Sequence, residues 1–161
     1  MPPITFGLNI RYKKNKLTNG GSVVDQSNKL NGSQIVAAMN AMIEKASQTP
    51  DEPVAMAIVD DTGNLRAYFS MDDLRLFSRK HAVRKAYTAA VLATDSGANA
   101  QRLHSQGRSI SELGDPQLTH GQGGLVIMNN GVVIGGIGVG GYPSGQADED
   151  LSRTGLDAMG I

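Results

Sequence analysis

Apolar residues recur with the period of a helix in the first well-patterned segment of the chain. The pattern predicts an amphipathic helix that runs to about residue 47 and is capped by Asn31 or Ser33. Its apolar face is made by Ile35, Met39, Met42 and Ile43. Before this helix, residues 1–30 form a polar leader with one strand-like stretch at 4–10, which we interpret as an arm or edge strand followed by a loop.

Two pairs of short apolar segments predict two β-hairpins. The run 54–59 is continuously apolar and bounded by turn residues, which is typical of a strand buried on both faces. A polar turn separates it from a second strand at 65–70. Later in the chain, strands at 125–128 and 132–139 flank Asn129-Asn130-Gly131, a typical hairpin turn.

Helices are predicted between and after the hairpins. They run from about 76 to 93, from about 96 to 106, and from about 147 to 159, and a long connection fills 107–124. The first carries a stripe of small residues that lets another backbone come close: Ala82, Ala86, Ala89, Ala90 and Ala93. Because strands come in adjacent pairs, the order favours an α+β fold with an antiparallel sheet covered by helices.

Composition excludes several classes of protein. The 161 residues suit one domain, and equal numbers of acidic and basic residues, 15 each, give no electrostatic footprint for nucleic acid or an anionic membrane. The absence of cysteine rules out disulfides and every Cys-based metal site. No apolar run approaches a membrane span, and Met1–Thr5 does not start a signal peptide. We therefore expect a cytoplasmic protein, or a mature chain whose leader has been removed.

The glycine-rich stretch Gly136–Gly141 is the most informative chemical feature. It matches G-x-G-x-x-G formally, but no helix follows it, so we reject a dinucleotide site. On a strand, Gly136, Gly138 and Gly140 share one face and leave a strip of bare backbone. Either a flat ligand or the alanine-rich helix can lie on that strip.

Histidine and lysine supply the candidate site chemistry. His81, Lys85 and Thr88 share one face of the predicted helix, where imidazole can ligate iron or act as a base, or the face can simply be solvated. His120 lies in a glycine-rich loop and can reach a ligand, whereas we interpret His104 as a surface residue. Histidines at these spacings do not form a local zinc motif.

Acidic residues have plain structural explanations beside the functional ones. Asp60 and Asp61 suit a hairpin turn. Asp72 can cap a segment or face a pocket, and Asp148 opens the last helix, where the dipole favours acids. Ser78 shares a helix face with His81, but no nucleophile elbow accompanies it.

These residues, in this order and spacing, resemble the GlcG/HbpS haem-binding family, whose domain also forms the C-terminal part of PduO-type corrinoid adenosyltransferases. The resemblance covers about residues 30–160. It rests on the segments 57–65, 85–90, 123–125 and 130–139, on Met71-Asp72 and Ser78, and on Asp148-Glu149. The family pattern falls on Asp60, Gly63, Met71, Asp72, Ser78, Lys85, Thr88, Gly124, Gly136, Gly138 and Asp148.

The resemblance implies a three-layer α/β/α fold of the profilin-like or PAS-like kind. It makes 1–30 an extension and 31–161 the GlcG/HbpS-like domain. It also implies a homo-oligomer, often an octamer, that binds haem or a related tetrapyrrole such as a corrinoid. Family members have been called haem-degrading.

Three hypotheses follow. The first is a tetrapyrrole-binding protein, with His81 or His120 as candidate iron ligands and a binding set of Met71, Ser78, His81, Lys85, Thr88, His120, Gly124, Gly136 and Gly138. The second is an enzyme that uses acid–base chemistry on a small polar metabolite, with catalytic candidates Lys85, His81, Asp72 and Asp148. The third is a scaffold subunit whose small-residue faces serve only assembly.

Overall fold

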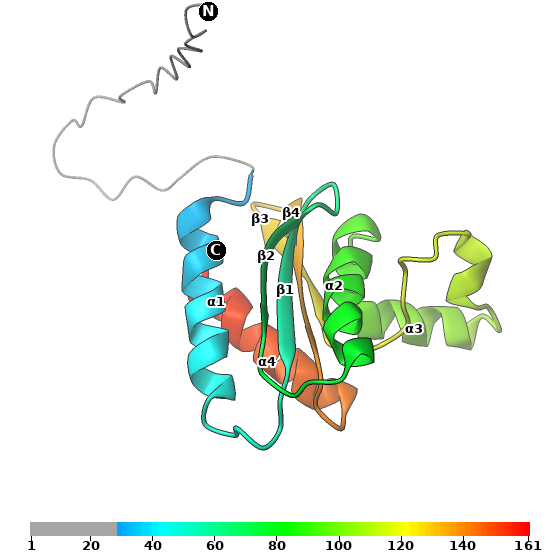
Figure 1. Cartoon of the computed structure of the whole chain (residues 1–161). Helices are drawn as coiled ribbons and strands as arrows, with labels where there is room; N and C mark the ends of the chain where they lie inside the picture. Colours follow the sequence, from blue (N-terminus) through cyan, green and yellow to red (C-terminus); the bar gives the residue numbers. More distant parts are fainter. Residues whose placement is uncertain (1–28) are drawn as a thin grey trace, which may run out of the picture.

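The structure, a computed structural model, describes residues 29–161 (Figure 1). The strand-like stretch predicted at 4–10 lies outside them. The elements are α1 (Gly32–Ala46), β1 (Ala55–Asp60), β2 (Leu65–Ser70), α2 (Leu76–Val91), α3 (Ser96–Ser105), a 3₁₀ helix η1 (Ile110–Leu113), β3 (Gly124–Asn129), β4 (Val132–Gly140) and α4 (Gly145–Ala158). Each predicted helix and strand in this region is present, and η1 was not predicted.

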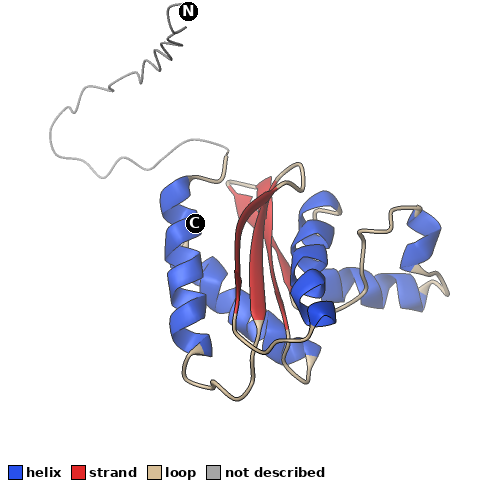
Figure 2. Ribbon diagram, in the orientation of Figure 1, coloured by secondary structure: helices blue, strands red, loops and turns tan. Residues whose placement is uncertain are grey.

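The strands form one antiparallel sheet in the order β2-β1-β4-β3, so the two predicted hairpins lie side by side (Figure 2). At the centre of the sheet, β1 of the first hairpin pairs with β4 of the second. Strands β1 and β3 are therefore not neighbours. This arrangement confirms the α+β fold with an antiparallel sheet.

Helices cover both faces of the sheet and complete three layers (Figure 1). Along β1, Met56 and Ile58 pack into the core under α1 and α4, whereas Ala57 and Val59 face α2. The two faces therefore differ in side-chain size: large residues fill one, and small residues line the other. Strand β1 is buried on both faces, as its continuous apolar sequence predicts.

The glycine strip of β4 is covered by α2, which decides between the two interpretations left open by the sequence. A Cβ at Gly138 would lie 2.5 Å from Ala86 N and 2.6 Å from Ala82 O, both backbone atoms of α2. Gly136 and Gly140 meet the same helix in the same way. No flat ligand has room there, so the interpretation of Gly136 and Gly138 as a surface for a ring is wrong.

Local signals set the ends of the elements as expected. Asn31 caps α1 through a reciprocal capping box with Gln34. The Asp60 carboxylate accepts backbone hydrogen bonds from Thr62 and Asn64, which confirms its role in the hairpin turn. Within residues 29–161, no helix is both long and apolar enough to cross a membrane.

Candidate functional site

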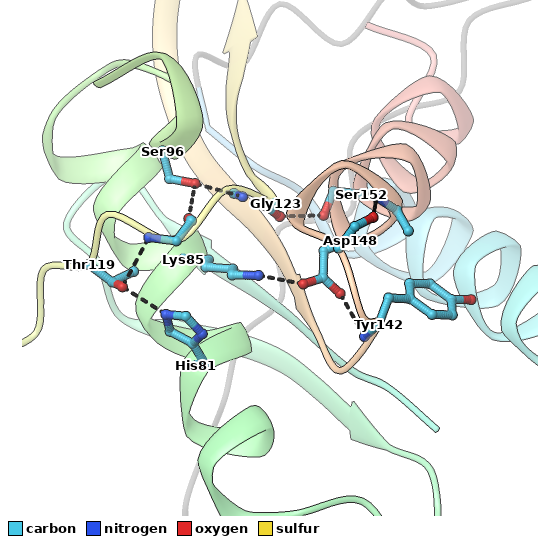
Figure 3. Close-up of polar contacts among 12 residues, drawn as sticks. His81, Lys85, Ser96, Thr119, Gly123, Tyr142, Asp148 and Ser152 are labelled. Carbon is cyan, nitrogen blue, oxygen red and sulfur yellow. Dashed lines mark hydrogen bonds and ion pairs between the residues drawn. The ribbon is translucent and has the colours of Figure 1, made fainter. Parts of the chain in front are cut away.

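The centre of the candidate site is a buried ion pair between two helices on opposite faces of the sheet. Lys85 Nζ lies 2.5 Å from Asp148 Oδ2, and the two side chains are 4% and 5% exposed. The second carboxylate oxygen, Asp148 Oδ1, accepts a hydrogen bond from the backbone N–H of Tyr142 (Figure 3). Asp148 therefore joins α2, α4 and the turn that follows β4, and is not simply a first-turn acid facing solvent.

Burial dominates the electrostatics of this carboxylate. Desolvation raises the pKa of Asp148 above its ordinary value, while Lys85 and the backbone N–H groups of the turn oppose the shift. A buried charge needs a partner with good geometry, and each of these two residues supplies the other with one.

The loop that precedes β3 lies directly over this pair. A Cβ at Gly123 would come within 2.6 Å of Asp148 Cβ and 3.0 Å of Lys85 Nζ, and Gly123 has a φ of +118°. A Cβ at Gly121 would come within 2.6 Å of the His81 ring. Both glycines are needed for this close approach. Neither Lys85 nor Asp148 lines the two cavities that are lined by the histidines.

Hydroxyl groups fix the same loop at several points. Ser96 Oγ donates to Gly121 O and accepts from Gly124 N, and Ser152 Oγ donates to Gly123 O (Figure 3). Each of these partners is a backbone group, so the path of the loop is set by buried side chains from α3 and α4.

His81 is tied into this framework through Thr119. Its Nε2 lies 2.7 Å from Thr119 Oγ1, which also accepts the backbone N–H of Gly121 at 3.2 Å. The hydroxyl proton is therefore free to be donated to Nε2, and we assign the imidazole proton to Nδ1. Burial, followed by the charges of Lys85, Arg84 and His120, lowers the pKa of His81 from 6.5 to about 4. His81 is thus neutral at pH 7.

Arg84 holds the earlier part of the same loop. Its guanidinium donates to three successive backbone carbonyls, those of Pro116, Gln117 and Leu118, at 2.6 to 3.2 Å. One turn along α2, Thr88 Oγ1 accepts the backbone N–H of Thr119 at 3.0 Å. Helix α2 therefore positions the whole segment that leads to His120.

Two adjoining cavities lie beside this segment, and together they gather all three histidines of the chain. The α3 cavity, of about 620 Å³, lies between α3 and η1 and is lined by His104 and His120. The α2 cavity, of about 420 Å³, is lined by His81 and again by His120. Ile110 is the other residue that the two share. The volumes fall in the range of small-molecule sites.

The α3 cavity combines apolar walls with a cation at its rim. Leu103 and Ile110 belong to a small buried cluster and supply part of the wall. Arg108 lines the same cavity, and its Nε is held by Glu112 at 3.0 Å. Because only the Nε is used in that ion pair, the other guanidinium nitrogens can bind an acidic group on a ligand.

The remaining predicted site residues lie elsewhere. Met71 and Asp72 line a different cavity, of about 610 Å³, beside Pro50 and Phe69. Three others have structural contacts in the core: Ser78, Thr88 and Gly124 are buried around α2 and the start of β3. The structure therefore brings His81, Lys85, Asp148 and His120 into one region and separates Asp72 from it.

The sequence analysis did not identify four residues that contribute to the candidate site. His104 is exposed as predicted, but it also lines the α3 cavity. Arg84, Arg108 and Thr119 acquire their roles from contacts with distant or irregular segments, and no motif marks them. Within the part of the chain described, no three His, Asp or Glu side chains group to hold a metal ion.

Comparison with known proteins assigns the chain and its fold to a family. Residues 30–157 match the family model described as "Haem degrading protein HbpS-like", and the chain belongs to this family. The crystal structure of HbpS superimposes with a TM-score of 0.74 and 29% identity, covering 90% of this chain and 100% of that one.

Two further similar proteins carry the name of a tetrapyrrole in their descriptions. The crystal structure of a PduOC–haem complex matches with a TM-score of 0.72 and 26% identity, over 81% of this chain and 94% of that one. The corrinoid adenosyltransferase PduO of Salmonella typhimurium is 31% identical over 125 residues, which is 75% of this chain. This match spans 36% of the length of that enzyme. The resemblance to the GlcG/HbpS family and to the PduO C-terminal domain is therefore confirmed.

Proposed function

We propose that this protein binds haem, or a closely related tetrapyrrole, in the α3 cavity. The observation that carries the proposal is the convergence of the three histidines, from α2, α3 and the loop before β3, on two cavities that share His120. Imidazole nitrogen is a common protein ligand of haem iron.

The donor set of the cavity fits such a ligand. The walls at Leu103 and Ile110 suit an apolar ring, and His120 supplies a nitrogen that makes no hydrogen bond to the described residues. Arg108 suits a propionate, since charge-assisted pairs between guanidinium and carboxylate are strong. When bound, the group would supply a coloured, redox-active iron centre, while the chain would bind and orient it.

Relatives support the same ligand class. The family model is described as haem-degrading, and a haem complex is known for PduOC. PduO is named a corrinoid adenosyltransferase, so a corrinoid is the competing tetrapyrrole. Cobalt and iron both accept an axial imidazole, and only a direct comparison distinguishes the two ligands.

The acid–base alternative has less support. His81 is neutral and lines the α2 cavity, which suits a base, but a pKa of about 4 makes it a weak one at pH 7. Lys85, the other candidate acid–base group, is paired with the candidate partner Asp148 beneath the loop, and the other candidate partner, Asp72, lines another cavity. We therefore favour a binding function.

A hemin titration followed by absorbance tests the proposal, with aquacobalamin titrated in parallel. We expect a Soret band that saturates at a fixed ratio with hemin and is weakened in His120→Ala. The exposed variant Asp61→Asn on the β1–β2 turn serves as the control. The absence of any saturable change with hemin would overturn the proposal, and saturation with aquacobalamin alone would reassign the ligand to the corrinoids.

Self-assembly into a homo-oligomer, of eight subunits, is part of the same proposal. Leu76 and Phe77 in the first turn of α2 are 65% and 68% exposed, an unusual exposure for adjacent large apolar residues. Light scattering on the purified chain measures the mass directly. A loss of mass in a Leu76→Gln/Phe77→Gln double variant would support this surface as an interface, and a monomeric native chain would refute the assembly.

A further inference from the structure

The two edges of the sheet differ in how their backbone groups are satisfied. Strand β3 forms one edge, where the N–H of Gly124 donates to Ser96 Oγ at 2.9 Å. The next outward N–H, that of Val126, donates to Asp95 Oδ1 at 2.9 Å. Strand β2 forms the other edge, and β1 is its single strand neighbour within residues 29–161. In this part of the chain, the β2 edge is therefore the one open to a further strand.

The backbone of β2 presents hydrogen-bonding groups away from β1. Met71 N donates to Val54 O at 3.0 Å, just before β1 begins. Because the bonds of an antiparallel ladder use alternate residues, Ser70 and Tyr68 direct their N–H and C=O groups outward. A row of outward groups is a template for another strand, and Arg66 is the single charged residue of β2.

Helix α1 carries apolar side chains beside this edge. Lys45 Nζ donates to Thr154 Oγ1 of α4, so the Lys45 side of α1 faces α4. At about 100° per residue, Val36 and Ile43 lie on the opposite side of α1. Because α1 packs over β1 and β2 whereas α4 packs over β3 and β4, this opposite side lies toward the β2 edge. Val36 is 58% exposed there.

Phe69 extends the apolar surface onto the strand itself. It pairs with Met56, whose side chain packs under α1, so Phe69 lies on the same face of the sheet. Phe69 is 36% exposed although it lies on the face that the core covers. The outer edge of β2, together with Val36, Ile43 and Phe69, therefore forms an edge surface that suits a strand with one apolar face.

The chain contains a segment with this pattern. Apolar residues occupy alternate positions of residues 4–10, so a strand formed there has one wholly apolar face: Ile4, Phe6, Leu8 and Ile10. The other face is polar or bare: Thr5, Gly7 and Asn9. Residues 4–10 lie outside the described part of the chain.

The position at which the described chain begins allows this segment to reach the edge surface. Leu30 is buried and lies against Gly135, which pairs with Asp60 at the end of β1, where the turn to β2 starts. Residues 11–28 number 18 and span up to about 60 Å when extended. The six residues of β2 span about 20 Å, so the connection is long enough.

We propose that residues 4–10 add to the outer edge of β2 of their own chain as a fifth strand. The added strand satisfies the outward N–H and C=O groups of Tyr68 and Ser70, and its apolar face covers Val36 and Phe69. It also closes the edge to pairing with a second copy of the chain. Neither role depends on the ligand of the α3 cavity, so the haem proposal stands or falls separately.

Hydrogen exchange of the full chain, resolved at single amides, tests the added strand. The N–H groups of Tyr68 and Ser70 should exchange about tenfold or more faster in Phe6→Asp/Leu8→Asp than in the native chain, because two charges on the apolar face prevent docking. Both substitutions lie outside residues 29–161 and leave the described core unchanged.

The matched control places the same charges on the other face of the same segment. Thr5→Asp/Asn9→Asp should retain the native exchange rates of Tyr68 and Ser70. Fast exchange of both amides in the native chain, or slow exchange that survives in Phe6→Asp/Leu8→Asp, would overturn the proposal. Slow exchange that is lost when the native chain is diluted would also overturn it, because the added strand would then come from a second copy.

Discussion

Lys85 on α2 and Asp148 on α4 form an ion pair of 2.5 Å beside the start of β3, although their helices cover opposite faces of the sheet. The pair therefore holds the three layers together at one edge. It also forms the floor beneath the loop that carries His120, because a Cβ at Gly123 would come within 3.0 Å of Lys85 Nζ. Its integrity should control both stability and the shape of the site.

Breaking one half of this pair should be costly. Lys85→Met leaves the Asp148 carboxylate buried without its cation, and we expect a loss of about 3–5 kcal/mol in the free energy of unfolding. The double variant Lys85→Met/Asp148→Leu removes both charges and should recover part of that loss. Urea unfolding followed by circular dichroism measures both values. A cost below about 1 kcal/mol in Lys85→Met would show that the pair is solvated.

The contact between α2 and the glycine strip predicts a strong effect from one methyl group. Gly138→Ala would place Cβ about 2.5 Å from backbone atoms of α2, so the helix must move away from the sheet. We expect a destabilisation of about 1–3 kcal/mol or more. Gly32→Ala is the matched control, because nothing lies within 4 Å of its added Cβ, and it should be neutral or slightly stabilising. Equal effects in the two variants would contradict the packing explanation.

His81 should make stability depend on pH. Its pKa falls from 6.5 to about 4 on folding, so between these values the unfolded chain binds more protons than the folded chain. The contribution of His81 to the free energy of unfolding should be full above pH 6.5 and should decline as the pH falls toward 4. Comparing urea midpoints of the native chain and His81→Gln from pH 4 to 7 isolates this contribution from that of Asp148. Parallel curves would show that His81 titrates normally.

Thr119 should matter for its hydroxyl rather than for its shape. Thr119→Val keeps the volume but leaves His81 Nε2 and Gly121 N without their partner, and we expect a loss of about 1–3 kcal/mol. Hemin should also dissociate faster, because the backbone on both sides of His120 loses a constraint. Thr119→Ser keeps the hydroxyl and should retain both properties. Equal hemin loss in the Val and Ser variants would argue against positioning through the hydroxyl.

The sequence by itself determined the four α-helices and the four strands of residues 29–161 and the fold class, but not the 3₁₀ helix η1. Periodic apolar residues marked α1, continuous apolar runs marked β1, and Asn130-Gly131 marked the second hairpin, because these signals are local and act within a few residues. Small residues on both α2 and β4 indicated that another group could approach each segment closely. The sequence did not determine whether a helix or a ligand covered the glycines.

Only the tertiary structure decided the candidate site. Lys85 and Asp148 are 63 residues apart, and Arg84 reaches its carbonyl partners more than 30 residues later in the chain. His81, His104 and His120 come from three segments with no common spacing. Contacts of this kind depend on how the layers pack and where irregular loops pass, and neither leaves a periodic trace in sequence. For the same physical reason, the sequence indicates only an isolated surface residue at His104. The cavity that His104 lines is formed by the packing of α3 beside η1.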